Sequence, residues 1–176
     1  RVVQHPDLDF VIGSLHELSD QEDFFSLTYT PETIPALMEQ YFSELLTICQ
    51  WGKFDVLGHL TYPLRYIEGE HGFSVPCSAY EEQIRQCFSA VIQAGKGIEL
   101  NVSGLRQKYG KPFPTLELLR LYRELGGEIL TIGTDAHCAA DLSSHLSDGM
   151  QLAKEAGFRY LCWFERHQPQ FTAISI

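Results

Sequence analysis

Three histidines and one aspartate stand directly after apolar runs of this sequence, in positions where they could bind a metal ion. Asp135 and His137 follow one such run with a single residue between them, and His16 and His59 each follow another. Carboxylate oxygen and imidazole nitrogen are suitable ligands for hard or borderline cations such as zinc and manganese. The pattern therefore predicts a metal site made of His16, His59, Asp135 and His137.

Each of these residues also has an ordinary structural interpretation. A histidine just past a strand can hydrogen-bond a loop carbonyl, and Asp135 could cap the N-terminus of a helix. The metal site is favoured because the three apolar runs read as strands of one parallel sheet, whose carboxyl ends share a face.

A second group of polar residues could bind a substrate beside that metal. Glu99 and Asn101 are two residues apart in an apolar run, so both point to the same side of a strand. Glu99 could ligate a metal directly or form a buried hydrogen-bonded pair with Asn101. The planar guanidinium of Arg106 suits a phosphate, although a solvated loop arginine would look the same. Arg65 follows His59 closely enough to reach the same face of the protein.

Alternating strands and helices are expected to position these side chains. The predicted strands cover about 9–14, 54–58, 97–102, 129–133 and 159–164, and the predicted helices cover about 34–51, 115–125 and 147–156. One more helix is expected to begin at Ser78 with a capping box completed by Glu81, and to end at Gly95. Residues 60–77 are expected to form a long loop.

This alternation predicts an α/β fold with a parallel sheet, because parallel strands need crossover connections. The strands are almost continuously apolar, as expected when helices cover both faces of a sheet. No glycine-rich nucleotide-binding loop is present. Chemically active residues after strands are typical of the C-terminal face of a β/α barrel. Five βα units do not close such a barrel, so we expect it to be incomplete, with N-terminal strands missing.

Composition excludes several classes of function. The chain of 176 residues is 44% hydrophobic and carries a net charge of −10, which argues against nucleic-acid binding. Its five cysteines form no C-x-x-C pair, so reduced thiols in a cytoplasmic protein are expected. We find no signal peptide and no apolar run near the ~18 residues of a membrane span.

Four segments together resemble one known family. VIGSLH (11–16), FDVLGHLTYPLRY (54–66), GIELNVSGLR (97–106) and LTIGTDAH (130–137) are similar to the polymerase-and-histidinol-phosphatase (PHP) family, and most of all to its histidinol-phosphatase branch. The resemblance runs from about residue 8 to 165. It implies a distorted (β/α)7 barrel whose mouth holds a cluster of up to three zinc, manganese or iron ions in the full-length enzyme, and fewer in this chain.

The resemblance also implies a role for each residue. His16 and His59 would bind one metal, Asp135 a second and His137 a third, with Asp135 and His137 taking part in catalysis. Arg106 would hold the substrate phosphate, near Asn101 and Arg65. Glu99 and Ser14 would support the ligands from behind. The implied reaction is hydrolysis of L-histidinol phosphate, a small phosphorylated substrate, to L-histidinol and phosphate.

One departure from the family pattern concerns the start of the chain. Family members open with an H-x-H pair, which these 176 residues lack, and the first residue is Arg1. We expect residues 1–176 to be the C-terminal two thirds of a single PHP barrel domain, inactive alone and active at full length. The open side of such a barrel allows a homodimer. The alternatives are a non-catalytic barrel used for binding or assembly, and a PHP phosphoesterase with another substrate.

Overall fold

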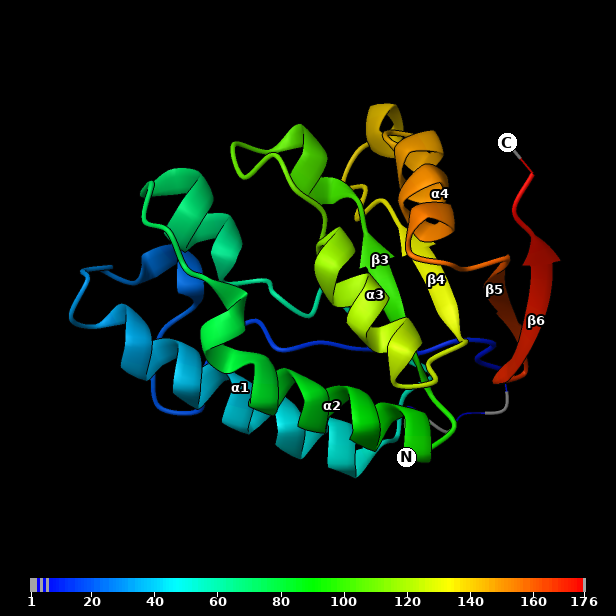
Figure 1. Ribbon diagram of the computed structural model, residues 1–176, viewed down its shortest axis with the longest axis horizontal. Coiled ribbons are helices and arrows are strands. Elements are labelled where there is room, and N and C mark those ends of the chain that lie inside the picture. Colours follow the sequence, from blue (N-terminus) through cyan, green and yellow to red (C-terminus); the bar gives the residue numbers. More distant parts are fainter. Residues whose placement is uncertain (1–2, 4, 6, 176) are drawn as a thin grey trace.

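A computed structural model describes residues 3, 5 and 7–175 of the chain. A parallel sheet of four strands forms its centre, in the order β1-β2-β3-β4. The strands are β1 (Ile12–Gly13), β2 (Val56–Leu57), β3 (Gly97–Asn101) and β4 (Leu130–Gly133). The α-helices are α1 (Ile34–Trp51), α2 (Glu81–Gln93), α3 (Leu116–Glu124) and α4 (Leu146–Glu155). Figure 1 shows α1 and α2 side by side along one edge of the molecule and α3 over β3.

The strand register brings the chemically interesting loops together. Ile12 pairs with Val56, and Val56 pairs with Gly97 on its other side. Ile98 pairs with Leu130, and all three pairings are parallel. The carboxyl ends of the strands therefore lie along one edge of the sheet, as the sequence predicts.

β1 and β2 are shorter than the predicted strands 9–14 and 54–58. Their ladder holds two residue pairs, Ile12 with Val56 and Gly13 with Leu57. At the amino end of β1, the Val11 N–H donates to Asp55 Oδ2 at 2.8 Å, and Val11 O accepts from the Asp55 N–H at 2.8 Å.

The fifth predicted strand does not join the parallel sheet. β5 (Tyr160–Glu165) pairs antiparallel with β6 (Gln168–Ala173), a strand that the sequence reading did not foresee. A two-residue turn reverses the chain, with Arg166 at φ 50° and His167 at φ 61°. Positive φ at both central residues is the geometry of a tight hairpin. The described residues therefore hold four parallel strands rather than five, and the incomplete barrel stays a prediction.

Two further local predictions were wrong. The expected loop 60–77 contains a helical turn, η3 (Arg65–Glu70), and α2 begins at Glu81 after a 3₁₀ turn, η4 (Cys77–Tyr80). No side chain caps α2, so the predicted capping box at Ser78 does not form. The end of α1 agrees with expectation, because Gly52 takes a left-handed φ of 62° and its N–H donates to Ile48 O.

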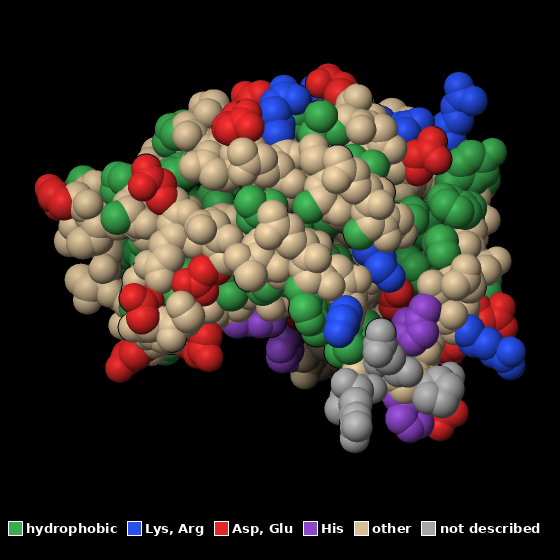
Figure 2. All heavy atoms as spheres, turned by 90° about the horizontal axis from the view of Figure 1, so that it is seen from below, with side chains coloured by type: hydrophobic (Ala, Val, Ile, Leu, Met, Phe, Trp, Pro, Cys, Tyr) green, Lys and Arg blue, Asp and Glu red, His purple; other side chains and the backbone are tan. Residues whose placement is uncertain are grey.

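The surface reflects the acidic composition. Carboxylates gather at the left end of the face in Figure 2, where neither lysine nor arginine is seen, and histidine side chains reach this face at separate places. None of the helices in the described part of the chain is long and apolar enough to cross a membrane.

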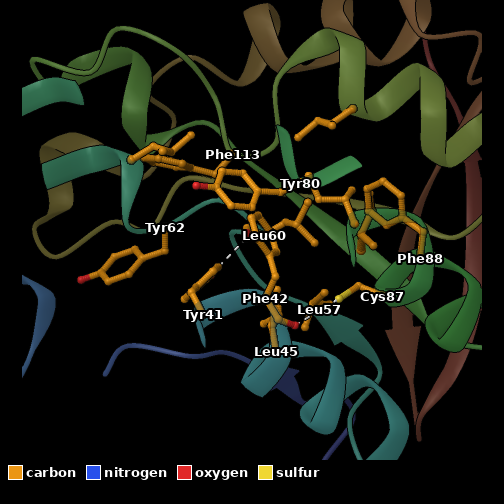
Figure 3. Packing of buried hydrophobic residues seen from close by; sticks show 14 of the residues in the cluster. Tyr41, Phe42, Leu45, Leu57, Leu60, Tyr62, Tyr80, Cys87, Phe88 and Phe113 are labelled. Carbon is orange, nitrogen blue, oxygen red and sulfur yellow. Dashed lines mark hydrogen bonds between the residues drawn. The ribbon is translucent and has the colours of Figure 1, made fainter. Parts of the chain in front are cut away.

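The hydrophobic core packs the sheet against all four α-helices, and its largest aromatic residues include several from α1 and α2. Tyr41 and Phe42 of α1 and Phe88 of α2 are fully buried there, close to Leu57 of β2 (Figure 3). The Tyr41 hydroxyl donates to Leu60 O at 3.1 Å, so the core also fixes the segment that follows β2. That segment carries His59.

Candidate metal and phosphate site

A pair of histidines faces each other at the carboxyl ends of β1 and β2. His16 Nε2 and His59 Nε2 are 3.1 Å apart, and the two ring planes make an angle of 65°. His59 is only 6% exposed, whereas His16 is exposed. Two imidazole nitrogens bound to one tetrahedral zinc ion lie about 3.3 Å apart, given Zn–N bonds of ~2.0–2.1 Å. The observed separation therefore fits two ligands of a shared cation.

The environment of His59 keeps its imidazole neutral. Burial, together with the neighbouring His16, lowers the pKa of His59 to about 4. A neutral ring keeps a lone pair for a metal at neutral pH. The Nε2 of His59 is within hydrogen-bonding distance of His16 Nε2, whereas its buried Nδ1 has no hydrogen-bond partner in the described part of the chain.

Tyr62 packs against both histidines, although the sequence reading did not single it out. Its ring centroid lies 5.2 Å from that of His16 and 4.6 Å from that of His59. Its hydroxyl pairs with the Tyr66 hydroxyl at 3.0 Å. The signal available in the sequence was its position three residues after His59.

Glu99 lies beneath the histidine pair and holds the backbone there. Its Oε2 accepts the His59 N–H at 3.1 Å and the Asn101 side-chain amide at 3.1 Å. Asn101 Oδ1 in turn accepts the Ser103 N–H at 3.0 Å. Burial raises the pKa of Glu99, and the nearby charge of Asp135 adds to that effect. Glu99 and Asn101 do lie on the same side of β3, and both are engaged with each other.

Two glycines make room for this carboxylate. A Cβ at Gly133 would overlap the Glu99 carboxylate, whose Cδ would be 2.7 Å away. A Cβ at Gly58 would come within 2.5 Å of Ser14 Oγ and 3.5 Å of Glu99 Oε2. Ser14 Oγ therefore lies beside Gly58, the residue before His59, and its supporting role stays a prediction.

Asp135 and His137 occupy the loop after β4. Asp135 is half-buried with a φ of 49°, a left-handed conformation that costs a non-glycine residue about 1 kcal/mol or more, although aspartate tolerates it better than most. Its carboxylate lies near enough to His59 to favour the charged ring. His137 is exposed, and its Nδ1 lies 2.9 Å from Asp135 O.

The two predicted phosphate-binding arginines differ in their partners. Arg106 is held by the carbonyls of Thr134 and Asp135, at 2.6 and 2.8 Å, and by Asp141 at 3.4 Å. Arg65 lies over the Tyr66 ring at 5.3 Å, and no carboxylate in the described part of the chain pairs with it. The charge of Arg65 also disfavours protonation of His59, which places it on the same side as the pair.

The described residues do not bring all the predicted ligands into one group. No set of three or more His, Cys, Asp or Glu side chains among residues 3, 5 and 7–175 is arranged to hold a metal ion. The structure joins His16 to His59, places Asp135 nearby, and leaves His137 exposed. The assignment of individual ligands therefore stays a prediction.

Comparison with known proteins gives one consistent picture. The family model described as "PHP domain" matches residues 2–103. A probable histidinol-phosphatase from Thermotoga maritima is 31% identical over 125 residues, which are 71% of this chain and 51% of that protein. A histidinol-phosphatase from Lactococcus lactis is 28% identical over 159 residues, 89% of this chain and 58% of that protein.

A solved structure shares the fold. The crystal structure of histidinol phosphate phosphatase from Lactococcus lactis, complexed with zinc, L-histidinol and phosphate, matches with a TM-score of 0.73 at 23% identity. The match covers 96% of this chain and 64% of that one. The chain thus spans between about half and two thirds of the length of the proteins it matches.

Proposed function

The chain belongs to the PHP domain family, and from that premise we propose that it forms part of a metal-dependent phosphomonoesterase that hydrolyses L-histidinol phosphate to L-histidinol and phosphate. The observation that carries the proposal is the facing pair of Nε2 atoms of His16 and His59, 3.1 Å apart at the strand ends. The substrate is suggested by the related proteins named as histidinol-phosphatases.

The proposed metal site consists of direct metal ligands and of residues that hold those ligands in place. His16 and His59 would hold one cation, with Asp135 and His137 serving further ions of a zinc, manganese or iron cluster. Glu99 and Ser14 support them from behind, Glu99 through the His59 N–H. A cation bound there would lower the pKa of a water ligand towards ~7 and offset negative charge on a phosphoryl group.

Other side chains at the carboxyl ends of the strands would bind the substrate and transfer a proton. Arg65 has no carboxylate partner in the described residues, so its guanidinium is available to grip the substrate phosphate. Arg106, whose guanidinium is held by two carbonyls and Asp141, would add positive charge for the same phosphate. The Asn101 amide is already bound to Glu99, so Asn101 shapes the substrate pocket through that carboxylate. Asp135 or a nearby histidine would pass a proton to the departing alkoxide.

A non-catalytic role is the second candidate, and one observation favours it. The described residues bring only two metal-ligating side chains face to face, and no group of three is formed among them. A barrel used for binding or assembly, including a homodimer, would need no more than that. We nevertheless expect turnover from the full-length gene product and none from residues 1–176 alone.

Phosphate release from L-histidinol phosphate tests the proposal directly. The full-length gene product would be assayed with zinc or manganese, against phosphoserine and glycerol phosphate as competing substrates. We expect a preference for L-histidinol phosphate and at least a 100-fold loss of kcat/KM in Asp135→Ala. Equal rates on all three esters, or unchanged activity in Asp135→Ala, would contradict the substrate or the site. Binding without any turnover would favour the non-catalytic role.

A further inference from the structure

The guanidinium of Arg106 makes three contacts with the loop that follows β4. Its two terminal nitrogens donate to adjacent backbone carbonyls, Thr134 O at 2.6 Å and Asp135 O at 2.8 Å. Its Nε lies 3.4 Å from Asp141 Oδ2. The side chain of Arg106 is only 20% exposed. A planar fork that spans two successive carbonyls fixes the peptide between them, which a single point charge cannot do.

The Asp135 carbonyl is a junction in this loop. It accepts from Arg106, and it lies 2.9 Å from His137 Nδ1. A carbonyl can only accept, so His137 donates through Nδ1–H and its Nε2 keeps the free lone pair. Metal-binding histidines commonly present one nitrogen while the other donates to a carbonyl in this way. The same backbone unit has the left-handed φ of 49°, which the surrounding contacts must maintain.

We propose that Arg106, anchored by Asp141, is a positioning residue that holds the Asp135 backbone, and that it thereby fixes the direction of the Asp135 side chain and keeps His137 in the tautomer whose Nε2 is free for a metal. The purpose of this positioning, which is metal binding, rests on the proposed function. This role of Arg106 does not require a bound phosphate, because its contacts are made within the protein. It also gives a role to Asp141, which sequence patterns did not single out.

Nuclear magnetic resonance of the metal-free chain tests the clamp in Arg106→Lys, which keeps the charge but loses the fork. We expect the backbone order parameters of residues 134–136 to fall from about 0.85 to below about 0.6. At about pH 8, where imidazoles are neutral, the ¹⁵N spectrum should show His137 shifting from the Nδ1–H tautomer to Nε2–H. A zinc chloride titration should show affinity about tenfold weaker.

Arg85→Lys is the matched control, because Arg85 pairs with Glu81 on the exposed face of α2. It should change none of these readouts. If Arg106→Lys fails to fold, the same measurements are made on Asp141→Asn, which should show a smaller change in the order parameters and in the His137 tautomer, in the same direction. Wild-type order and tautomer in either folded variant would overturn the proposal. The readouts need no turnover, so failure of the phosphatase assay would refute the proposed function and leave this result standing.

Discussion

The two ends of the parallel sheet both carry histidine and aspartate, yet they use them differently. At the amino ends, buried Asp55 accepts from the Val11 N–H and from His167 Nδ1, each at 2.8 Å, and lies 3.5 Å from Lys96 Nζ. At the carboxyl ends, the imidazoles of His16 and His59 face each other without a carboxylate hydrogen bond between them.

The polar residues at the amino ends stabilise the fold, whereas those at the carboxyl ends are suited to bind a ligand. Asp55 ties β1, the start of β3 and the β5–β6 turn together, so its partners hold the fold. The Nε2 atoms of the facing histidines bond to each other and not to a carboxylate, and His59 Nδ1 has no partner in the described residues, so the pair is suited to a ligand. Removing a group at one end should therefore affect unfolding, and at the other end metal binding.

Asp55→Ala should give the largest change in stability. It leaves Lys96, His167 and the Val11 N–H without their shared acceptor, and breaking a buried ion pair costs about 3–5 kcal/mol. Urea unfolding would measure the loss, while zinc affinity of the folded variant should stay within about threefold. A stability loss below about 1 kcal/mol, or a large loss of zinc affinity, would remove the contrast between the two ends.

His16→Ala should have the opposite profile. Loss of a direct ligand should weaken zinc binding by about 100-fold or more, measured by calorimetry. Because His16 is exposed and its Nε2 contacts only His59 Nε2, the free energy of unfolding of the metal-free protein should fall by no more than about 1.5 kcal/mol. His71→Ala is the control, since His71 is also exposed but packs on Tyr29. Equal zinc affinity in wild type and His16→Ala would disprove the ligand assignment.

The pH dependence of stability should carry the signature of His59. Its folded pKa of about 4 lies below the unfolded value of ~6.5, so the unfolded state binds more protons between them. Stability from this group is present above pH ~6.5 and is lost as the pH falls towards 4, by about 2–3 kcal/mol in metal-free protein.

Glu99 acts in the opposite sense, because burial raises its pKa and stabilises the protonated folded form. The comparison is therefore made between wild type and His59→Gln, which share Glu99. The difference in unfolding free energy between them should shrink as the pH falls from 7 to 4. A constant difference would show that His59 is not buried as a neutral ring.

Gly133→Ala should give a smaller loss, because the new methyl group would overlap the Glu99 carboxylate. Overpacking of this kind costs about 1–3 kcal/mol. Adding Glu99→Ala should recover part of that loss, so the double variant should be more stable than the two single effects predict. Simple additivity would mean that the two residues do not compete for space.

Much of the site was predictable because it follows from strand order. His16, His59, Glu99 and Asp135 each come at or just after an apolar run, and parallel pairing brings such positions to one edge. The predicted boundaries of α1 were correct for a similar reason, since apolar spacing and Gly52 mark them.

The parts that were not predictable depend on irregular backbone. The β5–β6 turn uses Arg166 and His167 at positive φ, where Asn-Gly would be the recognisable signal, and β6 itself is polar. His167 lies 112 residues from Asp55 in the sequence, and only the turn brings the two side chains together. Likewise, the partners of Arg106 lie in a loop whose path no periodic pattern encodes.

Anomalous diffraction at the zinc absorption edge, from crystals of the protein soaked in zinc chloride, tests the central claim most directly. The account predicts a peak within about 2.1 Å of both His16 Nε2 and His59 Nε2. A zinc ion bound instead at His167 and Asp55, with no density between the facing histidines, would contradict it.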